Sequence, residues 1–288
     1  YTAPAISGSV GDGGKVYQMQ FDYFASKEWE GSLKRSAING DQVDTNYDWE
    51  ASELLPSPGS RKIWTSLKGL NDDLNNFIDT NSDLINLNLF QLTGNAVPDY
   101  HNDSGSVNGI GRCGSSGYNE PTVEDGDADD AKGLINFIRG QDYFDYDGDC
   151  NLTENRSHYL ADIYNSQVLV VGAPSGDTSA LSENQEAYFR KEKNYDAFVS
   201  QNSARKKAIY AGANNGILHA FDADTGIEMW GFVPPLIASK LPTMINSGFN
   251  KTSGGGTVPI FGVDGSPVVH DVFMKKPGGT GKEWLSIL

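Results

Sequence analysis

The stretch that decides the fold is AIYAGANNGILHAFDADTGIEMWGF, residues 208–232. AIYAGA and GILHAFD are rich in residues that favour strands, and the Asn-Asn-Gly turn at 214–216 tolerates the positive φ of a tight hairpin. In the second turn, Asp222 and Thr225 can bond to nearby backbone and Gly226 can take the left-handed position. IEMWGFVP follows as a third strand. The stretch therefore predicts an antiparallel meander.

Short strand candidates elsewhere in the chain have the spacing of further meanders. They lie at 15–24, 32–38, 47–51 and 61–66, separated by polar turns. VLVVGAP (168–174) resembles AIYAGAN (208–214) at a spacing of 40 residues. A third, incomplete copy of the repeat is FGVDGSPVVHDVFM (261–274) followed by EWLSIL. A period near 40 is typical of one propeller blade per repeat.

Helical patterns interrupt the strands at three places. Apolar residues recur every three to four positions over 69–93, which predicts a helix there. A second helix is predicted from Asp127, a candidate N-cap, to Gly140, a candidate C-terminal stop. A third helical connection covers about 180–203. The long polar loop between the first two contains GIGRCG (109–114), but no strand precedes it, so dinucleotide binding is not predicted.

Composition limits the classes of protein that fit the sequence. Thirteen Tyr, thirteen Phe and five Trp supply core material, and 33 Gly favour a loop-rich, mainly β chain. The formal net charge of −16 predicts repulsion from nucleic acid and from anionic lipid head groups. No run of 18 apolar residues occurs, so no membrane span is predicted. The start at Tyr1 and the end within an expected strand suggest an excised or processed piece.

The two cysteines, Cys113 and Cys150, both lie in loop-like sequence and form no CxxC pair. In an exported protein they can form one disulfide, which would contribute about 3–4 kcal/mol by closing a loop of about 37 residues. The alternative is a pair of free thiols.

The turn and strand at 220–230 resemble the repeat of quinoprotein-type β-propellers. In such repeats a tryptophan packs against the next blade, because a single blade cannot bury both faces of its sheet. Asp222, Thr225, Gly226 and Trp230 are the matching blade-docking residues, and this role is structural. The fold class expected is mainly β: a modified quinoprotein-like propeller, incomplete in this chain, with helical and loop insertions.

A sharper resemblance covers nearly the whole chain. YAGANNGILHAFDADTG followed by GFVPP, preceded by LINFIRG (134–140) and HYLADIYNSQVLVVGAP, is similar to the type IV pilus tip adhesin and pilus biogenesis family of the PilC/PilY type. The resemblance divides the chain into entry strands (1–68), a helical and acidic-loop insertion (69–157) and propeller blades (158–288). It also implies that a further segment or a partner chain completes the propeller after Leu288.

The family implies a non-enzymatic protein that is exported through the periplasm and displayed at the pilus tip or cell surface. Its expected roles are pilus assembly, adhesion and twitching motility. Its expected partners are minor pilins or a pilus tip complex, together with a host or abiotic surface.

The acidic loop DYDGDCNLTE (145–154) is the best candidate for a chemical site. Calcium loops supply oxygen ligands at alternate positions around a tight turn. Asp145, Asp147, Asp149, Asn151 and Thr153 match that spacing in one register, and a shifted register uses Glu154 instead. Cys150 at the usual glycine position and Arg156 at the usual acidic position depart from the pattern. The sequence predicts Ca²⁺ here, with a solvated acidic turn as the alternative.

Catalytic patterns are weak throughout the sequence. His101, His158, His219 and His270 form no HExxH motif or close pair, and neither GxSxG nor GxxxxGK occurs. Two alternatives to a pilus adhesin stay open. One is a quinoprotein-like dehydrogenase, which would need several Trp-containing repeats around a cofactor. The other is an outer-membrane assembly scaffold.

Overall fold

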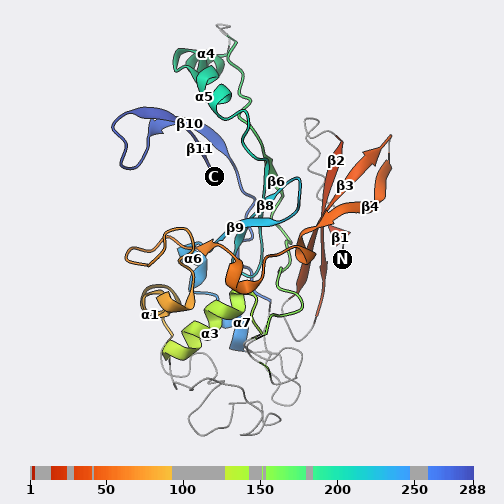
Figure 1. Ribbon diagram of the computed structural model, residues 1–288, viewed down its shortest axis with the longest axis vertical. Helices are drawn as coiled ribbons and strands as arrows, with labels where there is room; N and C mark the ends of the chain where they lie inside the picture. Colours follow the sequence, from red (N-terminus) through yellow and green to blue (C-terminus); the bar gives the residue numbers. More distant parts are fainter. Residues whose placement is uncertain are drawn as a thin grey trace, which may run out of the picture.

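The computed structural model describes residues 2–3, 14–24, 29–40, 42–92, 127–142, 151, 154–179, 184–246 and 259–288. Within these ranges the protein is mainly β, with two larger sheets, a separate hairpin and short helices between them (Figure 1).

An antiparallel sheet comes first in the chain. Its strand order is sequential, from β1 (Thr2–Ala3) through β2 (Lys15–Asp22) and β3 (Glu30–Asn39) to β4 (Gln42–Glu50). Alternation in β2 places Tyr17, Met19 and Phe21 on the buried face, as the period of a half-buried strand requires. The strands predicted at 15–24, 32–38 and 47–51 are confirmed.

The second sheet has five strands in the order β5-β9-β8-β7-β6. These are β5 (Ile63–Trp64), β6 (Leu169–Val171), β7 (Ala208–Gly212), β8 (Leu218–Asp222) and β9 (Glu228–Phe232). Strands β6 to β9 form an antiparallel meander, and β5 joins its edge parallel to β9. The meander predicted from 208–232 is therefore confirmed, and four antiparallel strands are the content of one propeller blade.

A separate hairpin pairs β10 (His270–Lys275) with β11 (Lys282–Ile287). Among the described strands it pairs with neither of the two larger sheets (Figure 1). No closed barrel or propeller forms among the described residues, whose sheets are two-, four- and five-stranded. The mainly β class is thus confirmed, whereas the quinoprotein-like propeller stays a prediction.

The helices are short. They are η1 (Ala51–Glu53), η2 (Pro58–Ser60), η3 (Asp79–Asn81), α1 (Ser82–Ile85), η4 (Asn86–Phe90), α3 (Asp127–Arg139), α4 (Gln185–Glu192), α5 (Tyr195–Gln201), α6 (Pro235–Ala238) and α7 (Thr243–Asn246). Helix α3 ends where Gly140 adopts φ +117, as predicted. None of the described helices is long and apolar enough to cross a membrane.

The helix predicted over 69–93 forms only between Asp79 and Phe90, as successive turns of different helical type. Asparagine side chains compete with the helix upstream. Asn76 donates to Thr65 O at 3.0 Å, and Asn81 donates to Asn71 O at 3.0 Å. Such bonds hold the backbone in non-helical turns. Leu74, one of the apolar residues that recur in this stretch, is 75% exposed.

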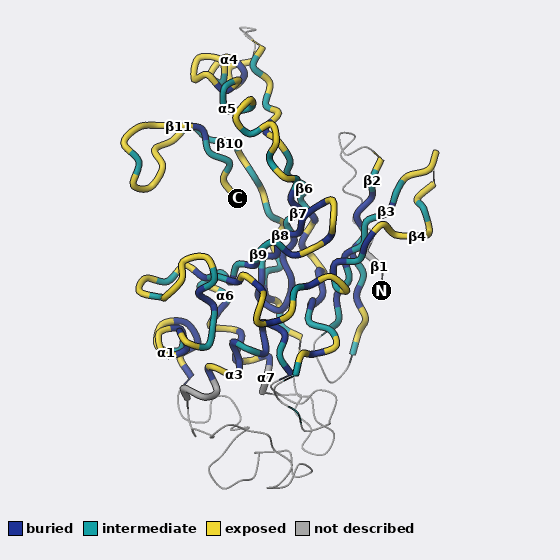
Figure 2. Tube along the Cα trace, in the orientation of Figure 1, coloured by how far each residue is buried: buried dark blue, intermediate teal, exposed yellow. Residues whose placement is uncertain are grey.

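Two buried clusters hold the sheets together (Figure 2). One joins α3 to the meander, with Leu134, Ile138 and Ile217 all fully buried. The other joins the N-terminal sheet to a different part of the same face of the meander, through Leu33 and Phe221. Helix α3 supplies a large part of the first cluster, so this helix is part of the core.

Candidate functional site

The AGANNG motif that carries the family resemblance is a joint between three chain segments. The Asn214 side chain donates to the Asp162 carboxylate at 2.6 Å, and its backbone N–H donates to Asp162 O at 3.0 Å. Its side-chain oxygen accepts from the Gly262 N–H at 3.1 Å. Because both ends of the Asn214 amide are used inside the protein, this motif is a structural element.

Glycines in the joint allow the backbones to approach closely. An added Cβ at Gly262 would lie 2.7 Å from the Gly216 backbone nitrogen. At Gly212 it would lie 2.7 Å from the side chain of Val263. Gly216 itself has φ +83, a conformation that other residues rarely adopt. The segment 261–263 is thereby held against the end of β7.

The ADTG turn connects the two larger sheets. The Asp222 carboxylate accepts from the backbone N–H groups of Asp224 at 2.9 Å and Thr225 at 3.2 Å. Gly226 has φ +76 and packs against the Trp49 ring of β4, and Trp49 Nε1 donates to Ala223 O at 3.3 Å. Asp222, Thr225 and Gly226 therefore shape a turn that docks on the N-terminal sheet.

Trp230 belongs to an aromatic row on one face of the five-stranded sheet. Its ring lies 5.7 Å from that of Tyr210, with the small Ala220 between them on β8. On its other side lies Trp64, at 6.5 Å, which in turn lies 4.3 Å from Phe232. All four aromatic rings are partly exposed. The row is an apolar surface that the sheet does not cover by itself.

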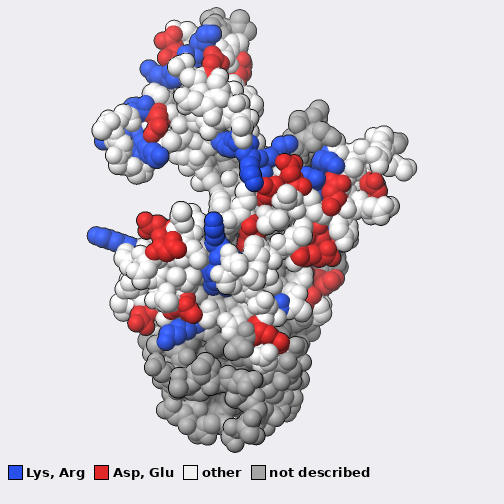
Figure 3. Space-filling view, viewed as in Figure 1, with Lys and Arg blue, Asp and Glu red and all other residues white. Residues whose placement is uncertain are grey.

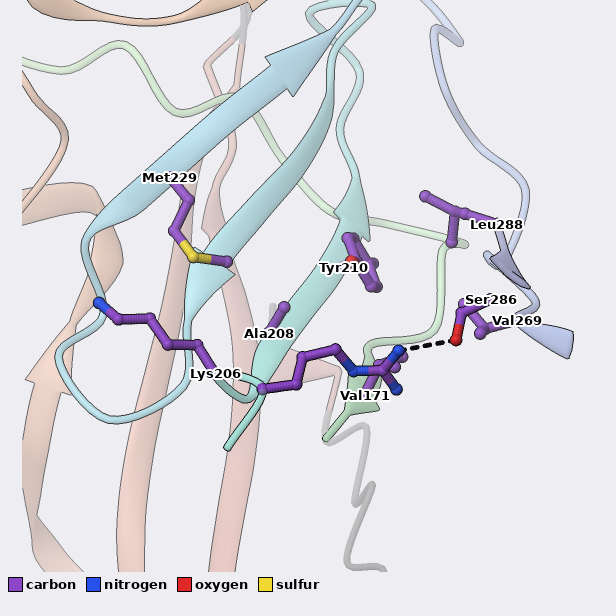
Figure 4. Close-up of a pocket in the computed structure, with 9 residues that line it drawn as sticks. Val171, Lys206, Ala208, Tyr210, Met229, Val269, Ser286 and Leu288 are labelled. Atoms are coloured by element: carbon purple, nitrogen blue, oxygen red, sulfur yellow. Dashed lines mark hydrogen bonds between the residues drawn. The ribbon is translucent and has the colours of Figure 1, made fainter. Parts of the chain in front are cut away.

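A groove runs along this aromatic row. Its volume is about 500 Å³, and its opposite wall comes from residues 263–268 and the end of β11. A smaller hollow of about 210 Å³ adjoins it and shares Tyr210, Ser286 and Leu288 (Figure 4). Figure 3 shows the indentation between the hairpin and the body of the protein. We take this groove as the candidate functional site.

Arg205 gives the smaller hollow its charge. Its guanidinium donates to Gly172 O through Nε at 2.8 Å. It also donates through Nη1 at 2.7 Å to Ser286 Oγ, the bond dashed beside Ser286 in Figure 4. Ser286 in turn donates to the Asp271 carboxylate, which also accepts from Tyr195. Among the described residues, those that line the two hollows include Arg205 and Lys206 but no Asp or Glu, although the chain has 38 acidic residues.

A cluster of buried charges lies beneath the other face of the meander. Arg61 donates twice to the Glu228 carboxylate, from Nε and Nη2, at 2.7 Å each. His219 Nδ1 lies 2.7 Å from the same carboxylate. The three side chains are at most 1% exposed. Because the three side chains are buried and bonded to one another, we interpret the cluster as part of the structural core.

Burial and charge act together on this cluster. Burial alone would raise the pKa of Glu228, but Arg61 and His219 lower it well below its usual range. Burial lowers the pKa of His219, in spite of the carboxylate beside it. Burial and the charge of Arg61 lower the pKa of Arg139 to about 10, so Arg139 is still charged at neutral pH.

Acidification is expected to destabilise the protein through His219. In the unfolded chain this histidine binds a proton below pH 6.5, its usual pKa, whereas the folded state resists protonation. The contribution of His219 to the free energy of unfolding is therefore fully present above pH 6.5. It decreases as the pH drops below this value, by at most about 1.4 kcal/mol per pH unit. Urea unfolding between about pH 7.5 and pH 5.5 measures this slope.

His219→Gln is the matched variant, because a glutamine amide can still donate to Glu228 but does not titrate. We expect a shallower dependence of stability on pH in this variant than in the unaltered protein. Equal slopes in the two proteins would show that His219 does not resist protonation in the folded state.

The predicted calcium loop falls largely outside the described residues. Asp145, Asp147, Asp149 and Thr153 lie there, as do Cys113 and Cys150. Of the predicted ligands, Asn151 and Glu154 are described, and the Asn151 amide donates to the Glu154 carboxylate at 3.2 Å. A bridge between Gln141 and Asn155 closes the base of the loop. Among the described residues, no group of three potential metal ligands occurs.

The geometry thus defines a mainly β protein with buried charges and an open aromatic groove. No family model and no solved structure matches the chain. A type IV pilus biogenesis factor PilY1 of Pseudomonas aeruginosa (strain UCBPP-PA14) is 27% identical over 285 residues, which are 94% of this chain and 20% of that protein. A PilY1 homolog of Xylella fastidiosa is 36% identical over 133 residues, 46% of this chain and 9% of that protein.

PilY1 of Pseudomonas aeruginosa PAO1 is 33% identical over 133 residues, which are 46% of this chain and 10% of that protein. The chain is related to type IV pilus biogenesis factors of the PilY1 type, which confirms the family resemblance. It spans between 9% and 20% of the length of these curated relatives.

Proposed function

We propose that this chain acts as a non-enzymatic adhesin or assembly factor of type IV pili, displayed at the pilus tip or cell surface after export through the periplasm. The observation that carries the proposal is the similarity to PilY1-type factors along 94% of the chain. The buried state of the Arg61–Glu228–His219 cluster supports binding rather than catalysis.

In this proposal the aromatic groove is the contact site. Trp64, Tyr210 and Trp230 are large, stiff side chains with partly exposed rings, the type that contributes most to protein interfaces. Its occupant is a minor pilin, another component of the tip complex, or a further polypeptide segment that completes the propeller. Adhesion to a host or abiotic surface and support of twitching motility follow from display at the tip.

Immunogold labelling of intact and sheared filaments tests the location. We expect label at filament ends. A gene deletion tests the role in assembly, with the full-length protein that contains the unaltered chain as the complementing control. The readouts are the number of surface pili and the diameter of the twitching zone. Normal piliation in the deletion strain, with filaments free of label, would contradict the proposal.

Trp230→Ala tests the groove, because it removes the centre of the aromatic row. We expect at least a tenfold loss in co-purification of tip components, since a buried aromatic anchor contributes about 2 kcal/mol or more at an interface. Trp230→Phe, which keeps an aromatic ring, should retain most of the binding. Both proteins must show unchanged thermal unfolding. Full co-purification by a folded Trp230→Ala protein would exclude the groove as the contact.

We also propose that the loop 145–154 binds Ca²⁺, on the strength of its alternating oxygen ligands and of the bridge that pins its base. Calorimetric titration of the chain with CaCl₂ should detect one site, and Asp147→Asn should abolish it. Asp129→Asn, in the neighbouring acidic run, is the matched control. Equal heats for all three proteins would indicate a solvated acidic turn.

A further inference from the structure

The aromatic groove is lined by uncharged side chains. Of the described residues that line it, none is Asp, Glu, Lys, Arg or His, and four are aromatic: Trp64, Tyr210, Trp230 and Phe232. The rest of the chain is strongly acidic, with a formal net charge of −16 for the whole. A charged ligand group would lose water in this groove without gaining a counter-charge, which is unfavourable. The groove therefore favours an uncharged ligand.

The aromatic side chains also carry hydrogen-bond donors that the fold leaves unused. Within the described part of the chain, the Tyr210 hydroxyl and the indole N–H groups of Trp64 and Trp230 have no hydrogen-bond partner. None of these atoms is fully buried, so a ligand in the groove can reach them. Burial raises the pKa of Tyr210, so its hydroxyl keeps its proton and remains a donor at neutral pH.

Side-chain acceptors are scarce in the same groove. Ser286 lines it, but its hydroxyl already donates to the Asp271 carboxylate at 2.5 Å and accepts from Arg205 at 2.7 Å. No Asn or Gln is present among the described lining residues. A sugar hydroxyl or the N–H of an ordinary peptide would give up its bond to water here without a side-chain acceptor to replace it. The groove therefore favours a ligand that accepts hydrogen bonds but does not donate them.

A proline-rich segment has this combination of properties. Proline has an apolar ring and no backbone N–H. In the polyproline II conformation its carbonyl groups make no internal hydrogen bonds, so they are free to accept from a protein. Such segments dock in grooves lined by aromatic side chains, and they lose little conformational entropy because the helix is already formed before binding.

The 288 residues of this chain do not contain such a segment. No two of its 12 prolines are separated by two residues, the spacing that places two prolines on one side of a polyproline II helix. The adjacent pair Pro234-Pro235 is used at the start of helix α6. The ligand must therefore come from outside the chain described here.

We propose that the aromatic groove binds an extended, proline-rich segment of a separate polypeptide in the pilus tip complex. The identity of the complex rests on the proposed function, whereas the class of ligand rests on the chemistry of the groove. Prolyl rings pack on Trp64 and Trp230, and the carbonyl groups of the segment accept from the indole N–H groups and from the Tyr210 hydroxyl. Binding is nearly independent of salt, because the described lining has no charged side chain.

Calorimetric titration of the 288-residue chain with a decaproline peptide, blocked at both ends, tests the proposal. The control peptide has the same length and alternates Gly with Ser, so it is flexible and carries N–H donors throughout. We expect decaproline to bind at least about tenfold more tightly than the control peptide. Its affinity should change by less than about twofold between about 50 mM and about 500 mM NaCl.

Tyr210→Phe is the sharpest variant, because it keeps the ring and removes only the donor. We expect about fivefold weaker binding of decaproline, the effect of one hydrogen bond. Tyr188→Phe is the matched control: it makes the same change at a 52% exposed tyrosine of α4 that does not line the groove, and it should bind like the unaltered protein. Trp64→Ala should bind at least about tenfold more weakly. Thermal unfolding shows that each variant is folded.

Equal affinities of Tyr210→Phe and Tyr188→Phe for decaproline would overturn the proposal, as would equal binding of the two peptides. Binding of cellohexaose in place of decaproline would also overturn it and would indicate a glycan site. If decaproline bound the 288-residue chain but not the full-length protein, another segment of the same polypeptide would occupy the groove, contrary to the proposal. Unlabelled filaments and normal piliation of the deletion strain, in contrast, would contradict only the role in pili, so the two failures are distinguishable.

Discussion

Replacing Glu228 with glutamine is expected to lower the free energy of unfolding by about 3–5 kcal/mol, because the change leaves the Arg61 charge buried without a counter-charge. Arg61 is fully buried and makes two 2.7 Å bonds to the Glu228 carboxylate. Arg61 also donates to Arg139 O at 2.8 Å, so the pair ties β9 to the end of α3. Urea unfolding followed by tryptophan fluorescence measures the loss.

A double-mutant cycle separates the ion pair from general packing. Arg61→Met/Glu228→Gln should be less destabilised than the sum of its two single variants, because no charge is then left unpaired. Glu186→Gln is the surface control, since Glu186 pairs with Arg190 at an exposed site, and a loss of no more than about 1 kcal/mol is expected there. Similar losses for Glu228→Gln and Glu186→Gln would refute the role assigned to the buried cluster.

The second large effect is expected for Gly31→Ala on β3. An added Cβ would lie 2.6 Å from the carbonyl carbon of Ala161, and the Gly31 N–H donates to Leu160 O at 2.7 Å. The obstacle is backbone, which cannot rotate away as a side chain can. The strand and the segment 160–162 must therefore separate, at a cost of about 1–3 kcal/mol or more. Thermal and urea unfolding measure this cost.

Gly59→Ala is the matched control for Gly31→Ala. Apart from Gly59 itself and its two neighbours in the chain, no described residue has an atom within 4 Å of the position of the added Cβ. We therefore expect a change of less than about 1 kcal/mol in either direction. If Gly31→Ala were as stable as Gly59→Ala, the close approach of β3 to the segment 160–162 would not exist in solution.

Several parts of the fold could be predicted because their causes are local. Alternation of apolar residues placed β2 and β3, and the glycines at 216 and 226 marked the turns on either side of β8. The failure of the predicted helix over 69–93 also has a local cause. Asn76 and Asn81 use their side chains to bond the backbone, which apolar periodicity does not reveal.

The candidate site could be predicted only in part. Trp230 was singled out from the repeat, but its neighbours Tyr210 and Trp64 were not, and Trp64 is 166 positions away along the chain. For Tyr210, a signal was available: the predicted hairpin pairs it with Ala220, which lies beside Trp230. Arg205 gave no signal, because its partners Gly172 and Ser286 come from segments far from it in sequence.

By itself, the sequence determined the elements: which stretches form strands and where glycine permits the turns. These depend on side-chain alternation and on backbone freedom within a few residues. Only the tertiary structure decided what the elements build: the Arg61–Glu228 pair, the contact of Gly31 with Ala161 and the groove beside Trp230. Each of these joins residues more than 100 positions apart, and only packing in the folded chain brings them together.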